Sequence, residues 1–196
     1  MAPDVPTVAR GAWIGMILIT RREGTDSMDD VLEIPSPVGL LRLRPEREED
    51  QDFRYRLFCD ARPPEFALLA PAAFEEIMTQ QFHAQTLSYL SQFPRARFDI
   101  IELSGEPIGR IVVDRPGDVL HLVDQAIVPR WRGRGVGTAT VRALMDEARG
   151  AGVLVRVEGA SESDPSLRLY LHLGFVPVET ASLHTRLEWR PTADKG

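Results

Sequence analysis

The sequence has one cysteine, one lysine and no long apolar run. Because Cys59 is alone, no intrachain disulfide and no all-cysteine metal site can form, and we expect a reducing, cytoplasmic location. The sequence also has fewer basic than acidic residues, 23 against 29. This balance argues against a protein that neutralises a nucleic-acid backbone. Lys195 is the only lysine, so we expect arginine rather than lysine at any phosphate contact.

No segment has the features of a membrane span or of a secretion signal. The apolar stretch 12–19 is shorter than the ~20 residues of a transmembrane helix and runs into Arg21-Arg22 instead of a small-residue cleavage site. Residues 1–35 have a linker-like composition that ends in Pro35-Ser36-Pro37. We therefore expect an N-terminal extension over 1–35, one domain over 36–190 and a short tail over 191–196.

Hydrophobic periodicity predicts a mixed α/β domain. A helix with Pro45 and several acids in its first turn is expected to end near Asp60, and a longer one to cover 72–93. Strands and turns then alternate as in an antiparallel meander, and a strand–helix–strand crossover follows. The expected strands cover 38–43, 97–103, 108–114, 119–128, 153–158, 175–179 and 183–189, and two further helices cover 137–150 and 164–173.

The most informative segment is Arg130-Trp131-Arg132-Gly133-Arg134-Gly135-Val136-Gly137-Thr138, between an apolar strand and an amphipathic helix. Alternate glycines allow a tight turn and close approach of a ligand, and the first N–H groups of the helix point outward. Together with the arginines, this loop suits a pyrophosphate-sized anion.

Three interpretations of this loop are open. It could be a glycine-rich turn with solvated arginines, or a nucleotide site of the dinucleotide-binding type with Glu158 as the ribose-binding acid. The dinucleotide spacing fails, however, because Thr140 stands where the third glycine belongs, and the loop has no Gly-Lys-Ser/Thr. The third interpretation is an acyl-CoA site, and two blocks of sequence favour it.

Arg132-Gly133-Arg134-Gly135-Val136-Gly137 resembles the Arg/Gln-x-x-Gly-x-Gly/Ala motif of the GNAT superfamily of N-acetyltransferases. Downstream, the segment from Asp164 to Phe175 resembles the family's Asn-x-Ala…Leu-Tyr-x-x-x-Gly-Phe block, with Asp164 in place of Asn and Ser166 in place of Ala. The resemblance implies a GNAT-like fold: a twisted, mostly antiparallel sheet of six to seven strands with about four helices, splayed between its fourth and fifth strands, here 119–128 and 153–158.

The resemblance also implies the cosubstrate and its contacts. Acetyl-CoA would lie in the splayed gap, its pantetheine arm along a strand end and its pyrophosphate on the loop amides. An N–H near Ile127 or Val128 would polarise the thioester carbonyl. The residues implied to bind the cosubstrate are Ala126, Ile127, Val128, Arg132, Gly133, Arg134, Gly135, Val136, Gly137, Thr138, Asp164, Ser166 and Tyr170.

In the family, the tyrosine that matches Tyr170 protonates or hydrogen-bonds the departing thiolate. A packed helix tyrosine is the structural alternative. Asp124 is the leading candidate for the general base, on the same strand face as Ala126 and Val128 if no bulge intervenes, and His121 acting through water is the second. The four histidines are dispersed, so we expect no metal.

The expected function is therefore transfer of an acetyl group from acetyl-CoA to a primary amine of a small molecule or protein, by direct attack in a ternary complex. The alternatives are a non-catalytic CoA-binding regulatory module and a nucleotide-binding domain. We expect a monomer or homodimer that binds neither nucleic acid nor membrane. Helices and strand within about 46–93 are implied to bind the acceptor, whose identity the sequence leaves open.

Overall fold

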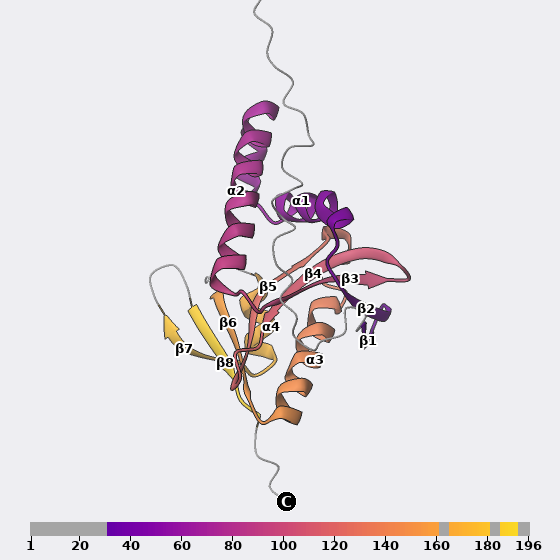
Figure 1. Cartoon of the computed structure of the whole chain (residues 1–196), viewed down its shortest axis with the longest axis vertical. Helices are drawn as coiled ribbons and strands as arrows, with labels where there is room; N and C mark the ends of the chain where they lie inside the picture. Colours follow the sequence, from indigo (N-terminus) through magenta and orange to yellow (C-terminus); the bar gives the residue numbers. More distant parts are fainter. Residues whose placement is uncertain (1–30, 161–164, 181–184, 192–196) are drawn as a thin grey trace, which may run out of the picture.

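One sheet of eight strands forms the centre of the molecule (Figure 1). The computed structural model describes residues 31–160, 165–180 and 185–191. The strand order is β1-β2-β3-β4-β5-β6-β8-β7, and every neighbouring pair is antiparallel except β5 with β6. The strands are β1 (Leu32–Ser36), β2 (Gly39–Pro45), β3 (Arg97–Leu103), β4 (Glu106–Asp114), β5 (Val119–Ile127), β6 (Leu154–Ala160), β7 (Val176–Thr180) and β8 (Thr185–Trp189).

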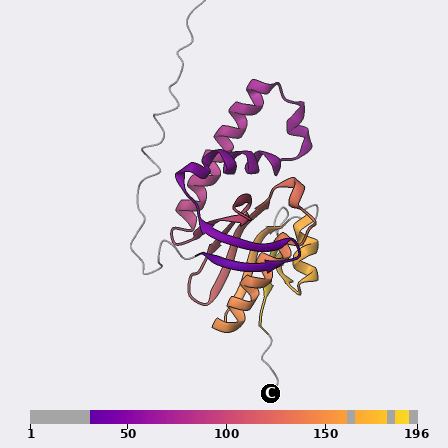
Figure 2. The ribbon, with the colours of Figure 1, turned by 90° about the vertical axis from the view of Figure 1, so that its right-hand side faces the viewer.

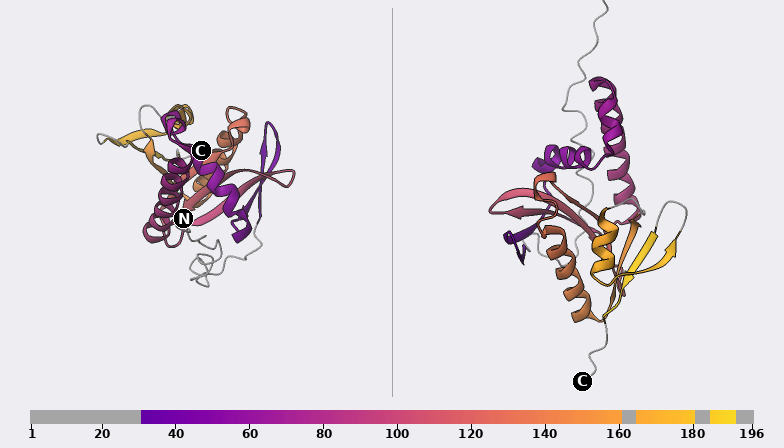
Figure 3. Two further views of the ribbon diagram at one scale, coloured as in Figure 1. Left: turned by 90° about the horizontal axis from the view of Figure 1, so that it is seen from above. Right: turned by 180° about the vertical axis from the view of Figure 1, so that it is seen from behind.

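Helices cover both faces of this sheet. Seen from behind, α3 (Val136–Ala151) and α4 (Pro165–His172) lie side by side over one face, and α1 (Gln51–Asp60) and α2 (Pro71–Gln92) lie at the upper end of the molecule (Figure 3). Short 3-10 turns lead into or follow the longer helices: η2 (Glu48–Asp50), η3 (Pro64–Leu68) and η4 (Pro129–Trp131). No helix among the described residues combines the length and apolarity that a membrane crossing requires.

Two groups of buried side chains hold these layers together. Val141, Leu144 and Ala148 lie on one face of α3, as its helical spacing predicts, and pack in the main core with Leu120 and Leu122 of β5. A smaller cluster joins α1 and α2 through Phe58, Met78 and Phe82. The two helix pairs therefore have separate apolar contacts, and β5 lies between them.

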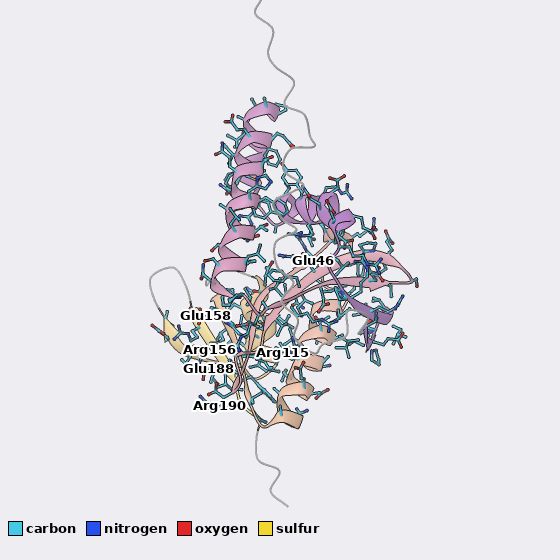
Figure 4. All side chains as sticks on the ribbon, viewed as in Figure 1. Glu46, Arg115, Arg156, Glu158, Glu188 and Arg190 are labelled. Atoms are coloured by element: carbon cyan, nitrogen blue, oxygen red, sulfur yellow. The ribbon has the colours of Figure 1, made fainter. Side chains whose placement is uncertain are left out.

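Ion pairs connect side chains of β6 and β8 and of the residue after β8. The side chains labelled in this region of Figure 4 are Arg156, Glu158, Glu188 and Arg190. The Arg156 guanidinium on β6 lies 2.7 Å from Glu188 Oε1 on β8, and Arg190 lies 2.9 Å from Oε2 of the same carboxylate. The hydrogen bond from Arg156 holds the pKa of the Glu188 carboxyl below its usual value. These contacts fasten β6 to β8, opposite the side on which β6 meets β5.

The fold class predicted from the sequence is confirmed, with one strand more than expected. The expected strand 38–43 corresponds to β2, but all of β1 except Ser36 lies in the stretch 1–35, for which the sequence predicts an extension. Pro35 and Pro37 suggested a linker, whereas Pro35 is in an edge strand and Pro37 in the hairpin turn, two places that tolerate the missing N–H. Figure 2 shows this indigo hairpin at the edge of the sheet.

Candidate active site

The glycine loop turns sharply into α3 and leaves the first turn of the helix without a side-chain cap. Gly133 and Gly135 have φ of +68° and +87°, in the left-handed region that favours glycine. Gly135 is the N-cap, and the first intrahelical bond runs from the Ala139 N–H to the Gly135 carbonyl. The N–H groups of Val136, Gly137 and Thr138 therefore precede the helical ladder, as in an anion site.

The β1–β2 hairpin packs against this loop. A Cβ atom placed on Gly135 would lie 2.9 Å from Pro37 Cγ, well inside contact distance. Gly137 also has close neighbours, since a Cβ there would lie 3.4 Å from Gln125 Oε1 and 3.6 Å from Leu169 Cδ2. The hairpin thus supports the loop from one side, and β5 and α4 enclose it from another.

The three arginines of the loop have three different environments. Arg130 pairs with Glu106 at the surface. Arg132 donates from Nε to the Ile127 carbonyl (2.8 Å) and from Nη2 to the Asp60 carbonyl (3.1 Å), so it ties the end of β5 to the end of α1. The Arg134 guanidinium lies 5.3 Å above the Trp131 ring and makes no ion pair within the described part of the chain. Of the three guanidinium groups, that of Arg134 is therefore the one whose charge is not already used, among the described residues, in an ion pair or in hydrogen bonds to backbone carbonyls.

Strands β5 and β6 separate after four residue pairs. Their parallel register runs from Val119 with Leu154 to Leu122 with Val157, and none of the described residues beyond it continues the ladder. The separation begins at a bulge in β5: Val112 of β4 faces Asp124, and Val113 faces Leu122, which leaves Val123 without a partner residue. This is the splayed gap that the sequence predicted between 119–128 and 153–158.

The backbone of Ile127 faces this gap. The Val128 N–H donates to the Ile108 carbonyl of β4 (2.9 Å), so it is not free to polarise a ligand. In an antiparallel ladder the neighbouring residue points its N–H and C=O the other way, which directs those of Ile127, and likewise of Gln125, toward the gap. The backbone groups of Ala126 and Val128 therefore point toward β4, and the predicted contacts of these two residues with the cosubstrate stay predictions.

The bulge also decides which face of the sheet each side chain of β5 occupies. Leu122 packs in the core under α3, and Gln125 donates to Thr140 of α3. Asp124 and Ala126 point to the opposite face, toward α1 and α2, as predicted for this pair. His121 lies on that face too, with its ring 5.1 Å from the Phe93 ring at the end of α2.

Asp124 and Ala126 belong to a small pocket between the sheet and the first two helices. Its volume is about 40 Å³, enough for a small polar group. Its walls combine apolar side chains from α1 and α2 with charged side chains, and they consist of Arg54, Leu57, Phe58, Ala61, Arg62, Phe82, Gln85, Arg110, Asp124 and Ala126. His121 is not among them, which favours Asp124 as the base that an acceptor in the pocket would meet.

A chain of alternating charges leads to Asp124. Arg110, buried on β4, lies 3.1 Å from Asp124 Oδ2 and also pairs with Glu46, and Arg54 Nε lies 3.1 Å from the other Glu46 oxygen. The last contact is an ion pair without hydrogen-bond alignment, since Arg54 Nε has no hydrogen-bond partner among the described residues. Glu46, labelled in Figure 4, lies between α1 and the sheet and joins the two arginines.

Burial shifts the proton equilibria of this cluster. It raises the pKa of the Asp124 carboxyl, against the opposing effects of Arg110 and of the Gln125 backbone N–H. The Gln125 N–H points into the gap, so the Asp124 carboxylate lies where the pocket meets the gap. Burial also raises the pKa of the Tyr89 phenol to about 12, with a further contribution from Asp124, and lowers the pKa of His121.

The second sequence block lies on α4. The Tyr170 ring is buried and packs edge-on against Phe175, with ring centres 5.5 Å apart. Ser166 is half-buried in the first turn of α4, and Asp164 lies outside the described residues. The structure therefore shows the packing of the tyrosine ring, and its proposed contact with a thiolate stays a prediction.

Sequence reasoning missed the side chains that surround Asp124. These side chains come from separate parts of the chain that no short motif joins: Glu46 from the connection after β2, Arg54 from α1, Tyr89 from α2 and Arg110 from β4. A signal was present at Arg110, because an arginine within the apolar strand Ile108–Val113 requires a buried carboxylate partner. Among the described residues no three His, Cys, Asp or Glu side chains form a metal-holding group, and the absence of a metal from the reaction stays a prediction.

Known structures share this architecture. The PaiA N-acetyltransferase of Thermoplasma acidophilum in complex with coenzyme A aligns with a TM-score of 0.59 and 13% identity, over 77% of this chain and 99% of its own. RimJ of Mycobacterium smegmatis in complex with CoA-disulfide aligns with a TM-score of 0.59 and 18% identity, over 84% and 88%. An acetyltransferase from Thermus thermophilus aligns with a TM-score of 0.57 and 20% identity, over 82% and 100%.

These likenesses show the fold, and the sequence itself shows the family. A search of the curated proteins gives no match. The model of the acetyltransferase (GNAT) family, however, matches residues 66–175, which include the glycine loop, the splayed strands and the Tyr170 block. That span is more than half of the 196 residues. The chain belongs to the GNAT acetyltransferase family.

Proposed function

We propose that this protein is an N-acetyltransferase that transfers an acetyl group from acetyl-CoA to a primary amine by direct attack. One observation carries the proposal: the part of β5 that separates from β6 contacts α3, whose first turn is uncapped, through Gln125 and contributes Asp124 to the pocket on the other face. Two structures of the same fold, PaiA and RimJ, contain coenzyme A and CoA-disulfide, which supports this cosubstrate.

The residues present fit acetyl-CoA, which supplies the acetyl group as a thioester. The N–H groups of Val136, Gly137 and Thr138 would hold the diphosphate, and Arg134 would add a charge-assisted contact. Gly133 and Gly135 make the left-handed turns that lead the chain into this helix start. The Ile127 N–H would stabilise negative charge that develops on the thioester oxygen, whereas the Ile127 carbonyl already accepts a hydrogen bond from Arg132 Nε.

Asp124 and Tyr170 are the proposed proton carriers. Asp124 accepts the proton that the amine loses as its nitrogen bonds to the acetyl carbon. Tyr170 gives a proton to the sulfur, which leaves with the electron pair of the broken carbon–sulfur bond. Exchange with water then restores both side chains. Arg110 positions the Asp124 carboxylate from the opposite side, 3.1 Å away.

We also propose a cytoplasmic location and no metal cofactor. Cys59 is the only cysteine of the sequence, so the fold does not depend on an intrachain disulfide and needs no oxidising compartment. Asp124 has the carboxylate that a neutral amine needs as a base, so positioning and proton transfer account for the reaction.

The test is release of free CoA thiol from acetyl-CoA in the presence of an amine panel, together with thermal shifts on CoA, NAD and ATP. We expect stabilisation by CoA alone and thiol release with some amines. In Tyr170→Phe we expect about 100-fold slower release with unchanged CoA affinity, the lower end of what one proton donor contributes.

Two results would contradict the proposal. Binding of CoA without thiol release to any amine would identify a regulatory CoA-binding module, and stabilisation by NAD or ATP but not CoA would identify a nucleotide-binding domain. Full activity in Tyr170→Phe would remove Tyr170 from the mechanism and leave its ring a packing element.

A further inference from the structure

The pocket at Asp124 contains more positive than negative charge. Three guanidinium groups line it, from Arg54, Arg62 and Arg110, and one carboxylate, from Asp124. Glu46 lies behind the wall and pairs with both Arg54 and Arg110. Three positive charges against two negative ones leave an excess of one at the pocket, although the whole chain has a net charge of −6. The unbalanced group is Arg62.

Arg62 is oriented by apolar and backbone contacts and not by an acid. Its guanidinium carbon lies 3.9 Å from the centre of the Phe58 ring, and its Nε donates to the Phe58 carbonyl at 3.3 Å. Within the described part of the chain no carboxylate lies in ion-pair distance of it. Stacking fixes the plane of the group, so its two Nη atoms remain as preorganised donors at the pocket.

Arg62 and Asp124 line the same pocket. Leu57 and Phe82 contribute apolar side chains to its lining, and Gln85 contributes an amide. A ligand in this pocket therefore meets a carboxylate base, a planar cation and an apolar surface.

We propose that the acceptor is a small amino acid-like molecule, with its amine at Asp124 and a carboxylate on the same molecule bound by Arg62. The inference rests on the proposed function. A simple cationic amine would leave the positive excess of the pocket uncompensated, whereas a carboxylate neutralises it through paired hydrogen bonds. A carboxylate next to the amine also favours a free amino acid over the N-terminus of a protein, where the carboxyl group of the first residue is part of a peptide bond.

The test compares matched acceptors that differ only in the carboxylate: L-phenylalanine with L-phenylalaninamide, and L-leucine with L-leucinamide. We expect kcat/KM of the wild type to be about 10- to 100-fold higher for the acids, as for loss of one charge-assisted contact. The amide amines are less basic, so more of each is neutral at pH 7. That difference favours the amides and makes the comparison conservative.

Variants of Arg62 locate the effect. In Arg62→Gln we expect the acids to lose about tenfold or more in kcat/KM, mainly through KM, and the amides to lose much less, so that the preference for acids disappears. Arg62→Lys keeps the charge without the planar fork and should fall between. Arg56→Gln is the matched control, since Arg56 is exposed on α1, outside the pocket, and its substitution removes the same charge. The comparison of acids with amides on the wild type does not depend on any variant folding.

Each other outcome decides against the inference. Equal rates for acids and amides, or transfer only to amines without a carboxylate, would overturn it with the proposed function intact. Transfer to peptides with a free N-terminus but to neither member of any pair would assign the pocket to a protein acceptor. Binding of CoA with no transfer to any amine would overturn the proposed function itself, and the inference with it.

Discussion

The two sides of β5 offer a ligand different kinds of chemical group: main-chain groups on one side and side chains on the other. On the α3 face, the features that suit a cosubstrate are main-chain groups: the first N–H groups of α3 and the gap-facing backbone of Ile127. On the α1 and α2 face, the features that suit an acceptor are side chains, among them Asp124, Arg110 and Arg62. Backbone donors serve any ligand with the same diphosphate and amides, whereas side chains can change without changing the fold. The comparison indicates that the first face defines the family and the second defines the substrate.

The largest effect is expected on the side-chain face, from Asp124→Asn. Loss of a positioned base costs about 10²- to 10⁴-fold in rate, so we expect kcat to fall by at least 100-fold and the Kd of CoA to stay the same. The pH dependence of activity is a second test of Asp124 as the base. Wild-type activity should fall as pH drops through the pKa of Asp124, which burial raises, because the protonated carboxyl accepts no proton. In Asp124→Asn, activity should not show this fall at low pH.

Asp118→Asn is the control for the base, because Asp118 is an exposed acid in the turn before β5 and does not line the pocket. It should leave kcat and the pH profile unchanged. A kcat of Asp124→Asn close to that of wild type would remove the main chemical distinction between the two faces and make His121 the next candidate.

An intermediate effect is expected on the backbone face, from Gly135→Ala. The left-handed φ costs a non-glycine residue about 1–2 kcal/mol, and the new Cβ would lie 2.9 Å from Pro37 Cγ. We expect the Kd of CoA, measured by calorimetry, to rise about tenfold. Gly152→Ala is the matched control, with φ of +70° and no atom within 4 Å of its Cβ, at the other end of α3.

The Gly152→Ala control separates the cost of a left-handed φ from the effect of a substitution in the glycine loop itself. Gly152→Ala should lower the free energy of unfolding by about 1–2 kcal/mol, the cost of the left-handed φ, with no change in the Kd of CoA. Pro37→Ala removes the Cγ and Cδ atoms that the new Cβ would meet, so the double variant Pro37→Ala, Gly135→Ala should recover part of the affinity. Equal CoA affinity in Gly135→Ala and wild type would show that the cosubstrate does not use this loop backbone.

The smallest effect is expected from Arg134→Gln. Arg134 is exposed and an exposed charge contributes little, so the Kd of CoA should rise only about two- to fivefold and the difference should shrink at high salt. Arg142→Gln, an exposed arginine further along α3, is the control and should have no effect. A larger loss in Arg134→Gln than in Gly135→Ala would reverse the comparison, because a side chain would then hold the diphosphate.

Local rules predict structure well in two places. The helical spacing of Val141, Leu144 and Ala148 predicts the buried face of α3, and the alternate glycines predict a tight turn, which Gly133 and Gly135 make with left-handed φ angles. Such rules failed at β1, where a linker-like composition hid an edge strand, because an edge strand and a hairpin turn tolerate proline as readily as a linker does.

The sequence alone determined the family, the loop that suits a diphosphate and the presence of Asp124 on a strand, because each depends on residues close together in the chain. Only the tertiary structure decided what surrounds Asp124. The bulge at Val123 sets which face its side chain occupies, and Glu46 and Arg110, 64 positions apart, meet only after β2, β3 and β4 have paired. A buried charge needs its partner in space and not in sequence, so the acceptor side of this protein becomes visible only when the chain is folded.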